Sequence, residues 1–271
     1  MSGNDSPTID LEKIVNDRAG KGRIPGFIIN WGKKFVHQDF INGFLQQGYE
    51  GVDFCENCIK YLDVDVKVEG MENLDGFEDG TRFTFVSNHP LGGIDGITLG
   101  MVFGRRFDGK IKYLVNDLLM NIKGLAPMCV PINKIGGQSR ELPRLIDEAF
   151  RSDNQMIMFP AGLCSRKTGN VIRDIPWGKA FINKSVQTGR YVVPVHFIGQ
   201  NSKRFYRVAA LCKKLKLKFN FAMLFLPDEM YRGQHGSYTV KVGKPVPPSH
   251  FDSSRSAFGW AQWVKEQVYS I

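Results

Sequence analysis

Hydrophobic residues follow two different periods along the chain. Before residue 62 they recur at helical spacing, as in the group Phe40, Ile41, Phe44, Leu45 and Tyr49. Residues 8–62 are therefore expected to be helical. Apolar and polar residues then begin to alternate, first at Val64, Val66 and Val68, which is typical of a strand. This change of period predicts a helical segment over residues 1–62 and an α/β domain over residues 63–271.

Beyond residue 62, short apolar runs alternate with stretches of helical periodicity. The expected strands cover residues 82–88, 111–116, 128–133, 155–160, 191–198 and 237–243. The expected helices cover residues 95–104, 139–152, 176–188 and 251–271. The apolar stripe of helix 139–152 indicates core packing, and Ser139 is its expected N-cap. The pattern predicts an α/β fold with a mixed, largely parallel central sheet flanked by helices.

The composition restricts the class of protein. The chain of 271 residues is 42% hydrophobic and 12% aromatic, which is enough for a buried core. It shows no signal-peptide core and no run near the roughly 18 apolar residues of a spanning helix. Five scattered cysteines are typical of a reducing compartment. Cys55 and Cys58 lack the second pair of a zinc site, so we expect two cysteines on a helix surface in a cytoplasmic protein.

The charge favours anionic partners. Against 36 Lys and Arg stand 27 Asp and Glu, a net charge of +9, which suits phospholipid head groups, an acidic carrier protein, phosphorylated thioesters or nucleic acid. One basic run abuts an apolar run at Lys213, Lys214, Lys216, Lys218, Phe219, Phe221, Met223, Leu224, Phe225 and Leu226. This segment suits either docking on a membrane or a buried core strand. A second candidate for membrane contact comprises Phe27, Ile28, Ile29 and Trp31 beside Lys33 and Lys34.

A histidine and an aspartate follow the strand 82–88, in the sequence Asn88-His89-Pro90-Leu91-Gly92-Gly93-Ile94-Asp95-Gly96. In open α/β sheets, ligands bind at this end of the strands. His89 can act as a general base near neutral pH, with the Asp95 carboxylate fixing its tautomer. In the alternative interpretation Asp95 caps the following helix and His89 packs locally. This motif alone does not decide between the two.

A second glycine-containing turn follows the strand 155–160. Its end carries Ser165, Arg166 and Lys167, which together with main-chain N–H groups can bind a phosphate or a carboxylate. The alternative is a basic loop in water. Two strand ends of similar design would direct their loops to one crevice, and this favours a functional site.

These residues resemble the glycerolipid acyltransferase family, which includes the lysophosphatidic acid acyltransferases. The chain is most similar to the bacterial branch that O-acylates lyso-ornithine and lyso-glycine lipids. The first motif of that family is Asn-His, four residues and Asp, with His as the base; Asn88, His89 and Asp95 match it. Five residues intervene here, one more than usual. The resemblance implies that Asn88, Gly92 and Gly93 contribute to substrate binding beside the catalytic pair.

The other motifs resemble the family less closely. In the second, Lys134 stands where an arginine usually contacts the acceptor phosphate. The third matches at Phe159, Pro160, Gly162 and Ser165, but it has Ala161, Leu163 and Cys164 where Glu, Thr and Arg are usual. The fourth matches at Val193, Pro194 and Val195. The resemblance covers about residues 64–245, and the departures imply an acceptor other than glycerol phosphate.

The resemblance implies a complete reaction. His89 would deprotonate the hydroxyl of the acceptor, which is a lyso-lipid of the N-acyl amino acid type. The deprotonated hydroxyl would then attack an acyl thioester carried by acyl carrier protein or coenzyme A. Neither a cofactor nor a metal is expected, and Cys164 is interpreted as a thiol that lines the pocket. The protein is expected to be peripheral, on an anionic membrane surface at the cytoplasmic side. The alternatives are a 1-acyl-glycerol-3-phosphate acyltransferase and a non-enzymatic basic protein that binds lipid or nucleic acid. The latter leaves the His/Asp turn without a purpose, and no nucleic-acid partner is expected.

Overall fold

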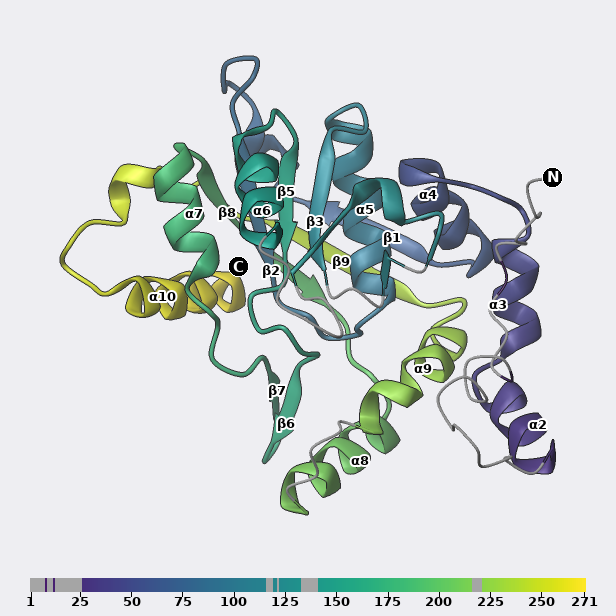
Figure 1. Cartoon of the computed structure of the whole chain (residues 1–271). Helices are drawn as coiled ribbons and strands as arrows, with labels where there is room; N and C mark the ends of the chain where they lie inside the picture. Colours follow the sequence, from purple (N-terminus) through teal and green to yellow (C-terminus); the bar gives the residue numbers. More distant parts are fainter. Residues whose placement is uncertain are drawn as a thin grey trace.

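A seven-stranded sheet forms the centre of the molecule (Figure 1). The computed structural model describes residues 8, 12, 26–115, 119, 120, 122–132, 141–215 and 221–271. The strands lie in the order β1-β9-β8-β2-β5-β3-β4. Their bounds are Asp65–Glu69 (β1), Phe83–Ser87 (β2), Ile111–Val115 (β3), Cys129–Pro131 (β4), Gln155–Met158 (β5), Tyr191–Ile198 (β8) and Ser237–Val242 (β9). Neighbouring strands run parallel except β8 and β9, which confirms a mixed, largely parallel sheet.

Helices cover both faces of the sheet (Figure 1). Their bounds are Gly26–Phe35 (α2), Gln38–Leu45 (α3), Gly51–Tyr61 (α4), Ile94–Arg106 (α5), Leu142–Arg151 (α6), Ala180–Thr188 (α7), Lys203–Lys214 (α8), Leu226–Arg232 (α9) and Ala257–Ser270 (α10). Short 3-10 helices span Met71–Leu74 (η1), Ala126–Met128 (η3), Phe221–Phe225 (η4) and Pro248–His250 (η5).

The core has two main layers because the side chains of a strand alternate between the faces of a sheet. On β2, Phe85 packs into the layer beneath α4 and α5, and its neighbour Val86 packs into the layer beneath α6, α7 and α10. Both residues are fully buried. Burial of such a side chain stabilises the fold by roughly 1.5–3 kcal/mol. Strand β2 therefore joins both layers and leads directly into the His/Asp turn.

The N-terminal helices share the first of these layers. Phe44 of α3 and Phe54 of α4 are buried in the same cluster as Phe85 of the sheet. The helices are interrupted at His37, whose φ of 52° is left-handed, and at Gly48, whose φ is 74°. The division of the chain at residue 62 stays a prediction.

Several expectations need correction. The run that suited a core strand forms η4 and the start of α9 in its described part, with Met223 and Leu224 exposed, so the strand interpretation is wrong there. Cys55 and Cys58 lie on α4 but are buried, because the helix turns this face toward α5. The short hairpin of β6 (Arg166–Thr168) and β7 (Val171–Arg173) was not predicted, and neither were α8 and α9. Five residues named above lie outside the described part of the chain: Lys134, Ser139, Lys216, Lys218 and Phe219.

Within the described ranges, no helix is both long enough and apolar enough to span a bilayer. No group of three or more His, Cys, Asp or Glu side chains in these ranges is arranged to hold a metal ion.

Candidate active site at the ends of strands β2 and β5

The two glycine-containing turns lie side by side. Strands β2 and β5 are parallel neighbours, with Val86 paired to Met158, so the segments that follow them leave the same edge of the sheet. The ring of His89 stacks on that of Phe159, with the centroids 4.1 Å apart. The main-chain N–H of Ser165 donates to the carbonyl of His89 at 2.8 Å. We call residues 88–95 the first turn and residues 159–165 the second turn.

His89 and Asp95 form a hydrogen-bonded pair. The distance between His89 Nδ1 and Asp95 Oδ2 is 3.0 Å. The same carboxylate oxygen accepts from the main-chain N–H groups of Leu91, at 2.9 Å, and Gly92, at 3.2 Å. Oδ1 accepts from Gly96 N at 2.9 Å. The first turn thus wraps around the Asp95 carboxylate and fixes its orientation toward the imidazole.

This wrapping accommodates the additional residue of the motif. Gly92 has a φ of 78°, a left-handed conformation that glycine adopts without strain. A Cβ at this position would collide with the side chains of Cys164 and Leu226. The extra residue is therefore taken up within the turn, and the pair still closes.

The surroundings set the protonation of the pair. Burial disfavours the charge of Asp95, but the imidazole of His89 and the main-chain donors outweigh it and lower the pKa of Asp95. Burial likewise opposes the charged form of His89, but the Asp95 carboxylate outweighs this effect and raises the pKa of His89. Because an ionised carboxylate only accepts hydrogen bonds, Nδ1 carries the proton. Nε2 of the neutral ring then has the free lone pair, on a side chain that is 19% exposed.

Two buried amides hold the first turn from behind. Asn88 bridges to β8: its Nδ2 donates to Phe197 O at 2.9 Å, and its Oδ1 accepts from Phe197 N at 2.7 Å. Asn201 Nδ2 donates to Pro90 O at 3.1 Å and to Leu91 O at 3.3 Å. The Asn88 amide thus anchors the end of β2, and its contact with a substrate stays a prediction. The sequence analysis did not identify Asn201.

The second turn places its polar groups differently. Ser165 is buried, and its hydroxyl donates to Asp174 Oδ1 at 2.6 Å. The guanidinium of Arg166 donates to Cys164 O at 2.6 Å, and its positive charge lowers the pKa of His89. Gly162 and Lys167 are exposed. Arg166 therefore places a positive charge close to the His/Asp pair. A role in substrate binding stays a prediction for Gly93, Gly162, Ser165, Arg166 and Lys167.

Cys164 is a buried thiol beside the first turn. Burial raises its pKa to about 12, so it is protonated at neutral pH. Because the thiolate is the nucleophilic form, this environment supports packing and not covalent catalysis. Lys134, the second-motif cation, lies outside the described residues.

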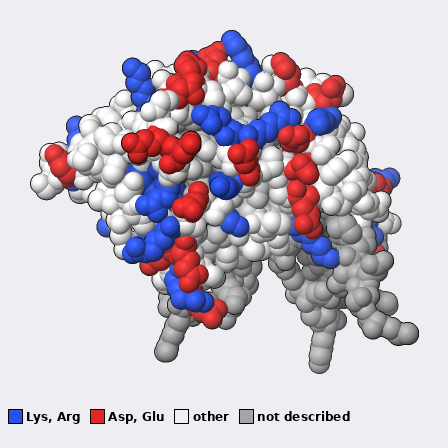
Figure 2. All heavy atoms as spheres, turned by 90° about the horizontal axis from the view of Figure 1, so that it is seen from above, with Lys and Arg blue, Asp and Glu red and all other residues white. Residues whose placement is uncertain are grey.

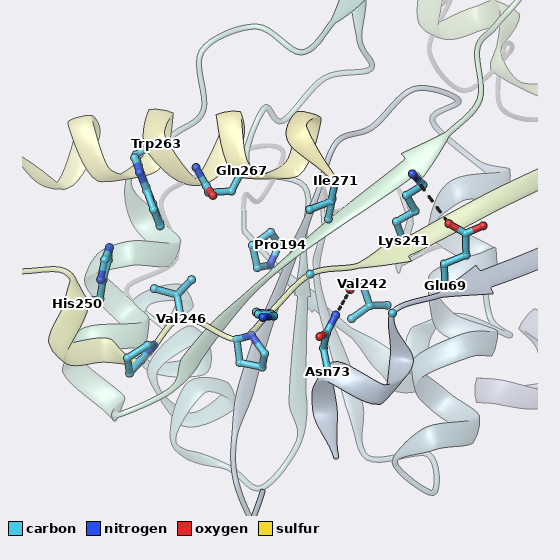
Figure 3. A pocket seen from close by; sticks show the side chains of 15 residues that line it. Glu69, Asn73, Pro194, Lys241, Val242, Val246, His250, Trp263, Gln267 and Ile271 are labelled. Carbon is cyan, nitrogen blue, oxygen red and sulfur yellow. Dashed lines mark hydrogen bonds and ion pairs between the residues drawn. The ribbon is translucent and has the colours of Figure 1, made fainter. Parts of the chain in front are cut away.

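A cavity of about 580 Å³ lies elsewhere, between α10 and the ends of β1 and β9 (Figure 3). Trp263 and Gln267 of α10 line one side together with Ile271, which follows this helix. Lys241 lies across from them, where it pairs with Glu69 at 3.9 Å. None of the residues that line it belongs to either turn. This cavity is therefore separate from the candidate active site at the two turns.

Fold and site together define an α/β protein with a hydrogen-bonded histidine and aspartate beside the ends of parallel strands. Residues 14–271 match the family model described as acyltransferase, and the chain belongs to this family. It is therefore an enzyme, and the non-enzymatic alternative is wrong.

Individual relatives refine this assignment. The chain is 54% identical over 267 residues to the lyso-glycine lipid O-acyltransferase of Bacteroides thetaiotaomicron, covering 97% of each chain. It is 51% identical over 267 residues to the protein of the same name from Phocaeicola vulgatus, covering 97% of this chain and 95% of the other. The 1-acyl-sn-glycerophosphate (LPA) acyltransferase PlsC from Thermotoga maritima shares the fold, with a TM-score of 0.51 and 20% identity over 81% of this chain and 77% of the other.

Proposed function

We propose that this acyltransferase moves a fatty acyl group from an acyl thioester to the hydroxyl of a lyso-aminolipid. The observation that carries the reaction type is the hydrogen bond of 3.0 Å between His89 Nδ1 and Asp95, because it leaves Nε2 as an oriented base. The names of two relatives that are more than half identical in sequence support the acceptor class.

In the proposed mechanism, His89 Nε2 takes the proton of the acceptor hydroxyl. The alkoxide forms a bond to the thioester carbonyl carbon, and main-chain N–H groups of the turns stabilise the oxyanion. The C–S bond then breaks, and the leaving thiolate takes up the proton from the imidazolium. The carboxylate of Asp95 stabilises the imidazolium while it exists. No covalent intermediate on the protein is required.

The second turn supports a carboxylate-bearing acceptor. Ala161 and Leu163 stand where the resembling family has Glu and Thr, so this turn offers few polar partners to a glycerol phosphate. Arg166 and Lys167 still offer positive charge. An N-acylated amino acid supplies both an anionic carboxylate for these cations and a hydroxyl on its fatty chain. The donor is proposed to be acyl carrier protein or coenzyme A thioester, with no further cofactor.

The end of the molecule that carries the turns is proposed to face an anionic membrane at the cytoplasmic side. Helices α2 and α8 project from this end, below the sheet in Figure 1. Large apolar side chains are exposed there, namely Phe27, Trp31, Leu211, Leu215, Met223 and Leu224, which we call the docking surface. Lys213 and Lys214 add charge at the end of α8. The surface is one unit, because Phe35 of α2 contacts Phe225 of η4 with ring centroids 5.0 Å apart.

The opposite end of the molecule has a different character. Figure 2 shows it from above, with basic and acidic side chains interspersed over the visible face. An anionic surface would gain little there, because each basic group has acidic neighbours. This arrangement favours docking through the end that carries the turns.

The acceptor is tested by comparing kcat/KM for a lyso-aminolipid with that for lysophosphatidic acid, using acyl carrier protein and coenzyme A thioesters. We expect the lyso-aminolipid to be preferred by about tenfold or more, a difference of roughly 1.4 kcal/mol. His89→Ala should lower kcat by roughly 10²–10⁴, because general-base catalysis contributes this much. A preference for lysophosphatidic acid would contradict the acceptor assignment, and near-normal activity of His89→Ala would remove His89 from the mechanism.

A further inference from the structure

A buried carboxylate joins the two turns from a third segment of the chain. Asp174 follows β7 and is 5% exposed. Its Oδ1 accepts from Ser165 Oγ at 2.6 Å and from the main-chain N–H of His89 at 3.3 Å. Its Oδ2 accepts from Trp177 Nε1 at 2.9 Å. One side chain therefore contacts both the turn that carries the base and the turn beside it.

Helix α10 sets the position of this residue. The main-chain N–H of Asp174 donates to Tyr269 Oη at 2.8 Å, and Lys265 Nζ donates to the Asp174 carbonyl at 2.6 Å. Lys265 thus binds the main-chain carbonyl of Asp174 and not its side chain. The carboxylate of Asp174 remains directed at the two turns. The C-terminal helix in this way supports the geometry of the site from behind.

The carboxylate of Asp174 is surrounded by hydrogen-bond donors. The three groups that point at it, from Ser165, His89 and Trp177, are all hydrogen-bond donors. An ionised carboxylate only accepts, so it satisfies all three at once. An asparagine has one accepting oxygen, and its amide would face a donor. The arrangement of the donors therefore matches a carboxylate and not an amide.

We propose that Asp174 is a positioning residue for acyl transfer, which holds His89 against the second turn and places a second negative charge near the imidazole. The inference rests on the proposed role of His89 as the base. Burial lowers the pKa of His89, and the carboxylates of Asp95 and then Asp174 raise it, while Arg166 opposes them. Among the described residues, the charged and titratable groups around Asp174 besides His89 include Lys265 and Tyr269 of α10, Arg173 of β7, Arg166 of β6, His196 of β8 and Cys164.

The test is Asp174→Asn, followed by thermal unfolding and by kcat/KM against pH. We expect kcat to fall by about 10- to 100-fold, because displacement of a catalytic group by about 1 Å has effects of this size. The acid limb of kcat/KM should move to lower pH, since one negative charge near His89 is lost. Wild-type kcat with an unmoved acid limb in a folded variant would overturn the proposal.

Two further variants separate charge from packing. Ser165→Ala keeps the Asp174 charge but removes one hydrogen bond, so kcat should fall several-fold while the acid limb stays in place. Glu266→Gln removes an exposed charge from the same helix and should change neither quantity. If Asp174→Asn does not fold, an unchanged kcat in Ser165→Ala overturns the proposal. If His89→Ala is inactive but Asp174→Asn resembles the wild type, this proposal fails and the proposed function stands.

Discussion

At the scale of single residues, the site depends on how one carboxylate is held. Asp95 accepts three main-chain hydrogen bonds besides that of His89, so its charge and orientation are fixed before any substrate arrives. A preorganised base needs little rearrangement at the moment of reaction. In the proposed mechanism, the pair also gives the reaction a defined dependence on pH.

The activity should decline on the acid side of a pH above 6.5. His89 must be neutral to accept a proton, and the Asp95 carboxylate raises its pKa above the ordinary 6.5 despite burial. The rate falls as the pH drops through this raised pKa, because the ring becomes protonated. In Asp95→Asn the acid limb should move to lower pH, and kcat should fall by up to about 10⁴-fold because the tautomer is no longer fixed. Profiles of kcat/KM against pH for both proteins measure this, and an acid limb shared by both would contradict the role of Asp95.

At the scale of elements, the sequence predicts those helices and strands whose apolar residues repeat regularly within the element itself. The strands and helices that flank the site were placed within a few residues, because their apolar residues repeat within one element. The pair of His89 and Asp95 was also accessible, because both lie in one turn. Asp174 and Asn201 were not, since their partners in the first turn lie 85 and 111 residues away along the chain. Helix α8 does carry a local signal for its start, because the side chain of the N-cap Ser202 accepts from the main-chain N–H of Phe205.

One element boundary depends on a buried arginine. Arg190 donates to Phe150 O at 2.7 Å and Ser152 O at 2.7 Å, at the C-terminal end of α6, and to Phe83 O at 3.0 Å, at the start of β2. Burial lowers the pKa of Arg190 to about 10, so it is still charged at neutral pH. The positive charge is favourable at the negative end of a helix dipole.

Arg190→Met should therefore lower the free energy of unfolding by roughly 2–4 kcal/mol, because an unpaired buried acceptor costs roughly 1–3 kcal/mol. Denaturant titration measures the change. Arg144→Met is the matched control: Arg144 lies on the exposed side of α6, and its loss should stay within roughly 0.5 kcal/mol. Equal effects of the two substitutions would show that the buried contacts do not stabilise the junction.

At the scale of the whole molecule, the candidate active site and the proposed docking surface lie at one end. Helices α2 and α3 are attached to α8 and α9 through Asp228, which accepts from His37 Nε2 at 2.8 Å and Arg232 Nε at 2.8 Å, and also from Arg204. A lipid acceptor could then enter the site from the bilayer surface without crossing water.

Trp31→Ser should lower the partition coefficient onto anionic vesicles about tenfold, since burial of an aromatic side chain contributes roughly 1.5–3 kcal/mol. Sedimentation with the vesicles measures this coefficient. High salt should release the wild type, because attraction to anionic lipid is screened. Phe258→Ser removes an aromatic side chain of similar exposure from α10 and should leave sedimentation unchanged. If Phe258→Ser weakens binding as much as Trp31→Ser, the docking surface is wrongly placed.

The order of the strands constrains how the chain can be assembled during synthesis. The edge strand β1 pairs with β9, and Asp65 and Ser237 are 172 residues apart in the sequence. On the ribosome, β1 therefore waits without its native partner until β9 has been made. Contacts of such long range close slowly, and an unpaired strand edge is exposed to other chains meanwhile. The sheet that supports the first turn can thus be completed only after β9 has been synthesised.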